Sequence, residues 1–584
     1  MKLQLNIWLV AITLLSFFFQ HSKTWSQTRP NIIVILTDDM GYADVGFNGG
    51  TNVATPNIDA LANIGTVFSS AYVAHPFCGP SRTAIMTGRY PHKIGAQYNL
   101  AETDVTNGID LNETFFSKVL QDAGYKTGAF GKWHLGQATA YKPNQRGFDY
   151  FYGFLPGGHN YTTATPGTNP YTWALQRNNA SAGTANGLYI TDLFSDEAVA
   201  FINNAESNDA QPFFMYIAYN APHSPTTPLV SDVTAITSAP YNLIFPNTTD
   251  GNLRKDHAAL VYGVDRGIKK IVDELKLKGE FDNTLIVFLS DNGGKVAVDG
   301  ANNSPLKGEK GDTYEGGYRV PMFMVYPNHI AAGAKYNDPV SSLDFYPTFV
   351  DLAGGTIPVG KQLDGKNIYP NIIASTNARA GEAIYTLRHN GTGFNNVGIR
   401  MDQWKAFSTG NGVWQLYNIV NDIGETTNLA SQNPTILKKM VEGAYQWSKT
   451  NVDALFFDSP AASTPWSDAN PPTKPENTLP NYQKTFSGYT LQTPKFLNYK
   501  YAVSLHPNPA KSEVNIELNF EAIDEIDVYI YDATGRPVQV QKNLIIGENN
   551  AIKFKLNPNL VNGTYYVRLV SGDYSFSKGL IVKK

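Results

Sequence analysis

The chain has 584 residues, of which 42% are hydrophobic and 16% are charged, and its formal net charge is −4. This length exceeds what one hydrophobic core supports, so we expect two or more domains. The composition excludes a disordered chain, and the slightly negative charge excludes a generally basic, nucleic-acid-binding surface.

The amino terminus has the pattern of an export signal. Lys2 precedes an apolar run from Ile7 to Phe19, and small residues follow up to Ser26. We therefore expect a signal peptide over residues 1–26 and periplasmic export to the cell surface or the medium. A membrane anchor is the alternative, but the run is shorter than the roughly 20 apolar residues that a span needs. No other segment is apolar enough to cross a bilayer.

Unbroken apolar runs predict buried strands in the first half of the chain. Asn31–Leu36 stops at Thr37-Asp38-Asp39, and Thr284–Leu289 stops at Ser290-Asp291-Asn292-Gly293. Such runs are typical of strands covered on both faces of a parallel sheet. Lys126–Phe130 and Pro212–Ala218 are further candidate strands.

Apolar residues at helical spacing predict helices over Asp192–Asn203 and His257–Lys276. Strands that alternate with helices indicate a three-layer α/β fold, which we place over residues 27–380. Ligands of such sheets bind beyond the carboxyl ends of the strands, where both acidic motifs lie.

The pattern changes in the last third of the chain. Short strands from Ile384 to Ile419 and a helix near Pro434–Lys449 predict a smaller C-terminal α+β subdomain over residues 381–458. Residues 459–498 are rich in Pro, Asn, Thr and Ser, which favours a linker or wrapped tail. Residues 499–584 alternate apolar and polar side chains between turns, which predicts a small antiparallel β-sandwich domain.

The single cysteine, Cys78, stands in His75-Pro-Phe-Cys78-Gly-Pro80-Ser81-Arg82. Pro80 suits the first turn of a helix, so Cys78 is expected just before a helix N-terminus, where backbone N–H groups favour anions. Arg82 would direct a guanidinium at the same anion. An inert, buried thiol is the alternative to a chemical role.

Acidic and amide side chains at the strand ends predict a metal site. Asp38, Asp39 and Asp291 would repel one another without a cation, and Asn292 adds an amide oxygen. These motifs contain no Cys or His, so their oxygen atoms favour Ca²⁺ or Mg²⁺ over zinc.

Together these motifs resemble the type I, formylglycine-dependent sulfatases of the alkaline phosphatase superfamily. Cys-x-Pro-Ser-Arg is the signature of that family, and the resemblance extends from about Arg29 to Ala430. Further motifs follow in the family's order: Asp38-Asp39-Met-Gly, Thr87-Gly88-Arg89-Tyr90-Pro91, Gly131-Lys132-Trp133-His134-Leu135-Gly136, Ala221-Pro222-His223, Ser290-Asp291-Asn292-Gly293 and Lys310-Gly-Asp-Thr-Tyr-Glu-Gly-Gly317.

The resemblance implies a three-layer α/β/α sandwich of the alkaline phosphatase/sulfatase type. It also implies that Cys78 is oxidised to 3-oxoalanine (formylglycine) by a formylglycine-generating or anaerobic sulfatase-maturing enzyme. The hydrated aldehyde would attack sulfur. One Ca²⁺ would be held by Asp38, Asp39, Asp291, Asn292 and residue 78.

The same resemblance implies roles for the remaining site residues. Arg82 and Lys132 would stabilise formylglycine and sulfate, and Lys310 would contact sulfate. His223, with Lys310, would protonate the leaving oxygen, and His134 would take the proton that allows sulfate to leave. Lys307 lies close enough in the sequence to exchange roles with Lys310.

The C-terminal domain resembles the sorting domain read by the type IX secretion machinery of Bacteroidetes. The motifs are His506-Pro-Asn-Pro-Ala, Asn562-Gly-Thr-Tyr-Tyr-Val-Arg-Leu and the terminal Lys578-Gly-Leu-Ile-Val-Lys-Lys584. A carbohydrate-binding or adhesion module is the alternative. If the sorting prediction is right, we expect removal of this domain after outer-membrane passage.

The sequence thus predicts an exported sulfatase that acts on sulfated polysaccharides or their oligosaccharides. Ulvan, carrageenan, fucoidan and glycosaminoglycans are all open as substrates, and the insert Gly157–Asn186 and the segment Pro225–Asp250 are expected to shape the pocket. Two rivals remain: a phosphatase or phosphodiesterase of the same superfamily, and a non-catalytic glycan-binding protein.

Overall fold

The computed structural model describes residues 29–459 and 503–584, with gaps at 163–173, 184–186, 206–210, 390–394, 410–412, 519–524, 533–536, 546–550 and 572–573. The expected signal peptide, and all but the first residue of the expected 459–498 linker, lie outside the described residues. The chain divides into two compact units, Met1–Thr485 and Phe486–Lys584.

A mixed sheet of ten strands forms the centre of the first unit within the described residues, in the order β11-β2-β10-β9-β1-β8-β4-β5-β6-β7. Its strands are β1 (Asn31–Asp38), β2 (Thr66–Phe68), β4 (Lys126–Lys132), β5 (Tyr150–Phe154), β6 (Leu175–Arg177), β7 (Ala180–Gly183), β8 (Phe213–Pro222), β9 (Thr284–Ser290), β10 (Met322–Val325) and β11 (Ala334–Tyr336).

The middle of this sheet is parallel. β1 pairs in parallel with β8 and β9, and β4 pairs in parallel with β8 and β5. All four predicted strand runs are therefore confirmed. β4 and β8 extend to Lys132 and Pro222, further than their apolar runs predict. The carboxyl ends of these strands share one edge of the sheet.

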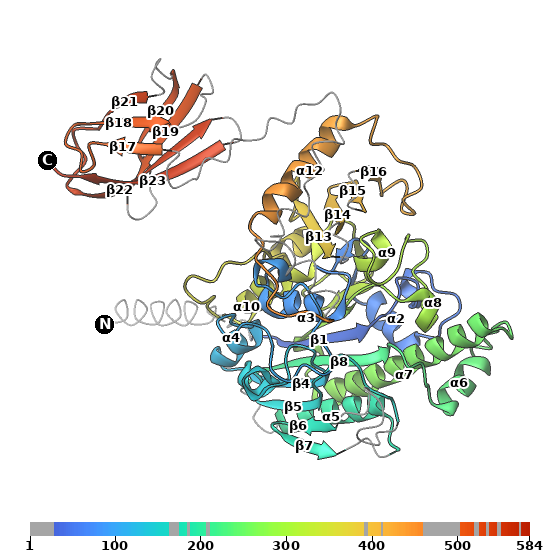
Figure 1. Ribbon diagram of the computed structural model, residues 1–584. Helices are drawn as coiled ribbons and strands as arrows, with labels where there is room; N and C mark the ends of the chain where they lie inside the picture. The colour runs from blue at the N-terminus through green and yellow to red at the C-terminus, as the bar shows by residue number, and fades with distance from the viewer. Residues whose placement is uncertain are drawn as a thin grey trace, which may run out of the picture. The chain divides into compact units, whose positions relative to one another are not determined.

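Helices cover both faces of the sheet because the side chains of each strand alternate between two cores. Ile32, Val34 and Leu36 belong to one core, and Ile33 and Ile35 belong to the other. The first core includes residues of α3 (Cys78–Thr87), α4 (Phe116–Asp122) and α10 (Phe345–Leu352). The second includes residues of α2 (Pro56–Asn63), α5 (Ile190–Ala205) and α7 (Thr249–Lys278). The expected three-layer α/β/α fold is confirmed (Figure 1).

Short elements connect these layers. They are β3 (Ala71–Tyr72), β12 (Val340–Ser341), α6 (Val230–Thr237), α8 (Val296–Asp299), α9 (Glu315–Tyr318), α11 (Tyr369–Ala374) and the 3-10 turns η1 (Gly46–Asn48), η2 (Pro91–Lys93), η3 (Thr139–Tyr141), η4 (Pro143–Gln145), η6 (Phe281–Asn283) and η7 (Ser342–Asp344).

The first unit ends in an antiparallel sheet with one helix. The strands β13 (Ala383–His389), β14 (Asn395–Met401), β15 (Trp404–Ser408) and β16 (Gln415–Asn418) pair in chain order, and α12 (Pro434–Ser448) contacts β13, β14 and β15. Leu437, Met440 and Val441 of α12 are buried. This matches the predicted short strands and helix of an α+β subdomain.

The second unit is a two-sheet β structure with its own core. The described strands are β17 (Val503–His506), β18 (Glu513–Leu518), β19 (Glu525–Tyr531), β20 (Pro537–Ile545), β21 (Ala551–Lys555), β22 (Gly563–Ser571) and β23 (Tyr574–Val582), in sheets β17-β18-β21 and β20-β19-β22-β23. β20 departs from the predicted alternation, because all of its described side chains are partly or fully exposed. No helix in the described parts of the chain has the length and apolar character needed to cross a membrane.

Candidate active site

Acidic side chains meet where β1 and β9 end. Thr37 pairs with Ser290 in the parallel register, so Asp38 and Asp291 lie side by side one residue further on. The backbone of Asp39 takes a left-handed conformation with φ of 64°, which turns the chain away from the sheet. Asp38, Asp39 and Asp291 are all buried.

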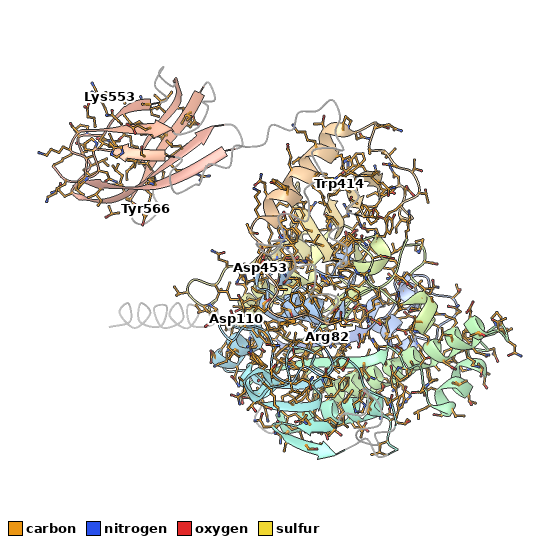
Figure 2. The ribbon with its side chains drawn as sticks, viewed as in Figure 1. Arg82, Asp110, Trp414, Asp453, Lys553 and Tyr566 are labelled. Atoms are coloured by element: carbon orange, nitrogen blue, oxygen red, sulfur yellow. The ribbon has the colours of Figure 1, made fainter. Side chains whose placement is uncertain are left out.

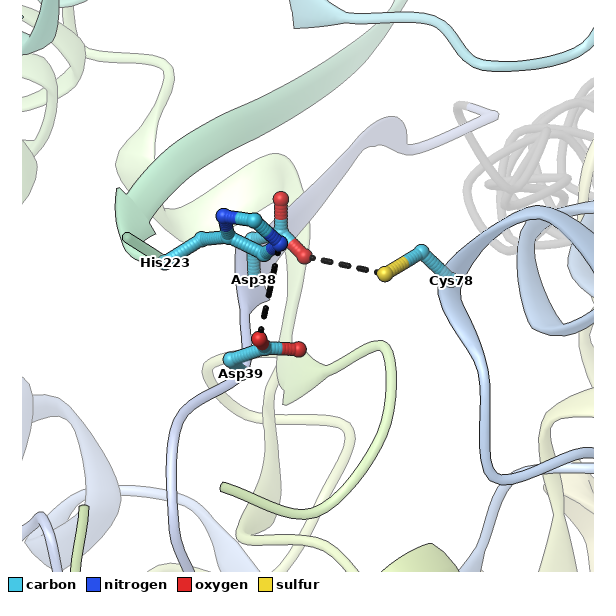
Figure 3. Close-up of side chains that lie close together, drawn as sticks. All are labelled: Asp38, Asp39, Cys78 and His223. Carbon is cyan, nitrogen blue, oxygen red and sulfur yellow. Dashed lines mark hydrogen bonds and ion pairs between the residues drawn. The ribbon is translucent and has the colours of Figure 1, made fainter. Parts of the chain in front are cut away.

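Cys78 reaches this cluster from α3. Its Sγ lies 3.4 Å from Oδ1 of Asp38 (Figure 3), and only 2% of the residue is exposed. The helix begins at Cys78 and not after it, because the N–H of Ser81 already donates to the carbonyl of Phe77 at 3.0 Å. Burial raises the pKa of the thiol well above its usual value, so an unmodified Cys78 would be a weak nucleophile.

Three predicted cationic residues converge on the carboxylates. Nε of Arg82 donates to Oδ2 of Asp291 at 2.9 Å, and Nη2 of the same guanidinium lies 2.8 Å from that oxygen as an ion pair. Nζ of Lys132 lies 2.5 Å from Oδ2 of Asp38. Nζ of Lys310 lies 2.7 Å from Oδ2 of Asp39, although Lys310 comes from a loop and not from a strand end. Figure 2 labels Arg82 in the interior of the first unit.

The two predicted histidines differ in their surroundings. His223 follows β8, and its Nε2 lies 3.6 Å from Oδ2 of Asp39 (Figure 3). His134 follows β4 and its Nε2 lies 3.3 Å from the carbonyl of Leu100. Burial and the charge of Lys132 hold the pKa of His134 well below its usual value. His134 is therefore neutral, and able to accept a proton, at neutral pH.

The oxygen atoms of the site have the character of metal ligands. Burial opposes ionisation of Asp38, but nearby cations led by Lys132 outweigh it and lower its pKa. Burial and the negative charge of Asp38 raise the pKa of Asp291 to about 7. The side-chain oxygen of Asn292 is buried without a hydrogen-bond partner among the described residues, while its Nδ2 donates to Oδ1 of Asp39 at 2.6 Å. These oxygen atoms fit a hard divalent cation.

The donor atoms that gather most closely differ in part from the predicted metal ligands. One ligand atom each from Asp38, Asp39, Cys78 and His223 lies within 4.8 Å of the other three. The structure thus brings three of the five predicted ligands together with a histidine. Asp291 lies beside them, where its Oδ1 accepts from the backbone N–H of Asp39 at 3.4 Å.

Asp299, at the end of α8, is a site carboxylate that sequence reasoning missed. It is 1% exposed, and burial together with the adjacent Asp39 raises its pKa to about 8. Four carboxylates therefore face the three permanent cations described above. The sequence holds no signal for Asp299, because it follows no strand and its motif, Val-Ala-Val-Asp-Gly, looks like an ordinary turn.

The structure separates Lys307 from Lys310. Nζ of Lys307 donates to the carbonyl of Glu425 at 3.3 Å and lies 4.3 Å from the centre of the Tyr314 ring. Glu315, which follows Tyr314 in the sequence, is buried and accepts a hydrogen bond from Lys405 at 3.0 Å. Lys307 and Glu315 therefore support the loop that carries Lys310, and neither touches the carboxylate cluster.

Comparisons with protein-family models match three parts of the chain. A sulfatase model matches residues 30–355, and a model described as N-sulphoglucosamine sulphohydrolase, C-terminal, matches residues 309–446. A model described as secretion system C-terminal sorting domain matches residues 504–583. The last match indicates secretion or a place at the cell surface.

Individual sulfatases are also similar to this chain. The chain is 35% identical to the uncharacterized sulfatase YdeN of Escherichia coli (strain K12) over 60% of this chain and 67% of that protein. It is 30% identical to arylsulfatase J of Mus musculus over 76% and 79% of the two chains. The crystal structure of Ps i-CgsB in complex with k-i-k-neocarrahexaose superposes with a TM-score of 0.72 at 45% identity, over 79% of this chain and 100% of that one.

Proposed function

The chain belongs to the sulfatase family and is a sulfuric ester hydrolase, and from this premise we propose that its substrates are sulfated galactans of the carrageenan type. The observation that carries the substrate class is the match to Ps i-CgsB, which covers that whole chain and whose bound ligand is a carrageenan hexasaccharide. A fucoidan or glycosaminoglycan substrate has less support, because the chain is 25% identical to the PsFucS1 sulfatase and 23% identical to a solved Bacteroides thetaiotaomicron sulfatase that belongs to glycosaminoglycan metabolism.

We propose that residue 78 is the nucleophile as formylglycine, made by a maturation enzyme. When hydrated, this group supplies one hydroxyl to attack sulfur and a second to release sulfate afterwards. The proposal is supported by the place of Cys78 beside Asp38 and by the raised pKa of its thiol, which makes the unmodified residue unsuited to the task.

We propose that a calcium ion is held by oxygen atoms of Asp38, Asp39, Asp291 and Asn292, together with residue 78. The ion supplies positive charge that neutralises the carboxylates and polarises a sulfate oxygen when bound. The unpartnered Asn292 oxygen and the raised pKa of Asp291 support this ligand set.

The cationic side chains would hold the substrate sulfate and the reacting group. Arg82 and Lys132 are fixed by Asp291 and Asp38, so their N–H groups are held in place before sulfate binds. Lys310 and His223 both reach Oδ2 of Asp39, and His223 would give its proton to the leaving oxygen. His134, kept neutral, would accept the proton that accompanies sulfate release.

We further propose that the signal peptide and the C-terminal domain direct the enzyme through the type IX secretion machinery. The match over residues 504–583 supports this route. The exported enzyme would then meet carrageenan outside the cell, and the C-terminal domain would be removed after passage.

Turnover on defined substrates tests the proposal. The purified, matured protein is offered carrageenan, ulvan, fucoidan and glycosaminoglycan oligosaccharides, and also an aryl sulfate matched to an aryl phosphate. We expect sulfate release from the carrageenan oligosaccharides and from the aryl sulfate. Selective desulfation of a glycosaminoglycan would contradict the substrate class, and preference for the aryl phosphate would favour the phosphatase alternative.

Mass spectrometry and metal removal test the cofactors in the same preparation. We expect a mass loss at the Cys78 peptide, and Cys78→Ala to abolish turnover while the protein stays folded. A chelator should remove activity and lower the melting temperature, with both restored by Ca²⁺. An active enzyme with an unmodified thiol would refute the proposed nucleophile.

A further inference from the structure

We propose that Arg388, with the ring of Phe77, forms a second anion-binding position at the mouth of the catalytic site. Its ligand would be a sulfate group carried elsewhere on the same oligosaccharide. This inference rests on the proposed function and adds to it a residue that selects multiply sulfated substrates.

Arg388 comes from β13 of the C-terminal subdomain but lies against the catalytic segments. Its Nη1 donates to the carbonyl of Gly311 at 2.7 Å, and its guanidinium carbon lies 4.9 Å from the centre of the Phe77 ring. Gly311 directly follows Lys310, and Phe77 directly precedes Cys78. The guanidinium therefore contacts the residue that follows Lys310, a candidate sulfate-binding residue. It also contacts the residue that precedes Cys78, the proposed nucleophile.

The segments that carry Phe77, Gly311 and Arg388 are tightly packed against one another. The N–H of Gly311 donates to the carbonyl of Pro76 at 2.9 Å, and its φ of 89° suits only glycine. A Cβ atom on Gly311 would lie 2.9 Å from Nη1 of Arg388 and 3.0 Å from the Phe77 ring. The position of Arg388 relative to Cys78 is thus set by packing.

The exposure and the N–H groups of the Arg388 side chain suit it to bind an anion. It is partly exposed, as is Phe77, and the bond to Gly311 uses one of the five N–H donors of a guanidinium. The planar fork of arginine suits the tetrahedral oxygen atoms of sulfate, and an aromatic face beside it offers a surface for a sugar ring. Asp458 is a carboxylate close to Arg388. Burial raises the pKa of Asp458 and the charge of Arg388 opposes that rise, so the carboxylate partly offsets the positive charge of Arg388.

Carrageenan oligosaccharides carry several sulfate groups along one chain. When one of them occupies the catalytic site, others on the same molecule are available to a cation beside that site. A fixed cation there would favour multiply sulfated chains over a small aryl sulfate, which carries a single sulfate and no sugar.

Binding and turnover together test this inference. The inactive Cys78→Ala protein is titrated calorimetrically with a carrageenan hexasaccharide, and so are the double variants that add Arg388→Gln or Arg388→Lys. We expect Arg388→Gln to weaken binding about tenfold, the loss of one charge-assisted contact, and Arg388→Lys to weaken it less. In the active enzyme, Arg388→Gln should raise KM for the hexasaccharide and leave kcat/KM for an aryl sulfate within about twofold, because the aryl group reaches no second anion site.

The outcomes separate this inference from the proposed function. Unchanged hexasaccharide binding in Cys78→Ala/Arg388→Gln would overturn the role of Arg388, even if the active enzyme releases sulfate from carrageenan. An equal loss of kcat/KM on both substrates would also overturn it, since that result marks a structural role. Binding that depends on Arg388 without turnover of carrageenan would support Arg388 and refute the proposed reaction. Failure of Cys78→Ala to bind the hexasaccharide would refute both.

Discussion

At the scale of single residues, two lysines three positions apart have different surroundings. Lys310 lies 2.7 Å from Asp39, whereas Lys307 rests on the Tyr314 ring and the carbonyl of Glu425. We expect Lys310→Met to lower kcat/KM on an aryl sulfate by about 100-fold or more, as the loss of a preorganised donor does. Lys307→Met, the matched control, should lower it less than about tenfold. Equal losses in the two variants would contradict the assignment.

His134 leads to a prediction about pH. Burial and nearby cations lower the pKa of His134, so its neutral form persists below the usual histidine pKa of about 6.5. If His134 is the base, protonation removes activity on the acid side, and we expect that limb of the pH profile of kcat well below pH 6.5. The profile is measured on an aryl sulfate with saturating Ca²⁺. An acid limb above that value would assign the base to another group.

At the scale of elements, the loop that carries Lys310 is held by the C-terminal subdomain. The buried ammonium of Lys405, in β15, lies 3.0 Å from Oε1 of Glu315 and 3.6 Å from Oε1 of Glu425. Oε2 of Glu425 also accepts from the backbone N–H of Glu315 at 2.8 Å, and Tyr72 donates to Glu315 at 2.7 Å. One cation therefore ties β15 to the segment that begins α9.

Removal of the Lys405 ammonium should destabilise the protein. We expect Lys405→Met to lower the free energy of unfolding by about 3 kcal/mol, because both buried carboxylates would lose this ammonium and Glu315 would keep the ion pair with Arg319 at 3.1 Å. The exposed Lys335→Met is the control and should change stability by less than about 0.5 kcal/mol. Denaturant unfolding measures both, and similar midpoints for the two variants would contradict a structural role for Lys405.

At the scale of the whole molecule, each unit has a core of its own. Among the described residues, the buried hydrophobic side chains of the second unit, such as Val514, Ile530 and Leu569, form a cluster of their own. The site residues all belong to the first unit. The division therefore allows the C-terminal unit to serve export without a part in catalysis.

Truncation tests that separation. We expect a chain that ends at Thr485 to keep kcat/KM within about twofold and to keep the melting temperature of the first unit, since no catalytic side chain and no part of its core is lost. Turnover and calorimetric melting are compared with those of the full chain. A large loss of activity would show that the second unit contributes to the site.

Much of the fold was predictable because its signals are local. Ile32–Leu36 and Leu285–Leu289 are apolar throughout, as is typical of strands covered on both faces, and the acidic residues that follow them lie at the sheet's edge. The lone Cys78 and the motifs around it likewise identified the family. The ends of β4 and β8 were less predictable, because Gly131-Lys132 and Asn220-Ala221-Pro222 leave the apolar pattern while still belonging to their strands.

The sequence by itself therefore determined the order of layers, the position of the single cysteine and the acidic strand ends. Only the tertiary structure decided which lysine reaches Asp39, and only it placed Asp299 and Arg388 beside the site. Those side chains come from a short helix, loops and a separate sheet, and their positions depend on contacts between segments far apart in the chain. Periodicity reports which face of an element is buried, but it holds no information about which distant segment will pack there.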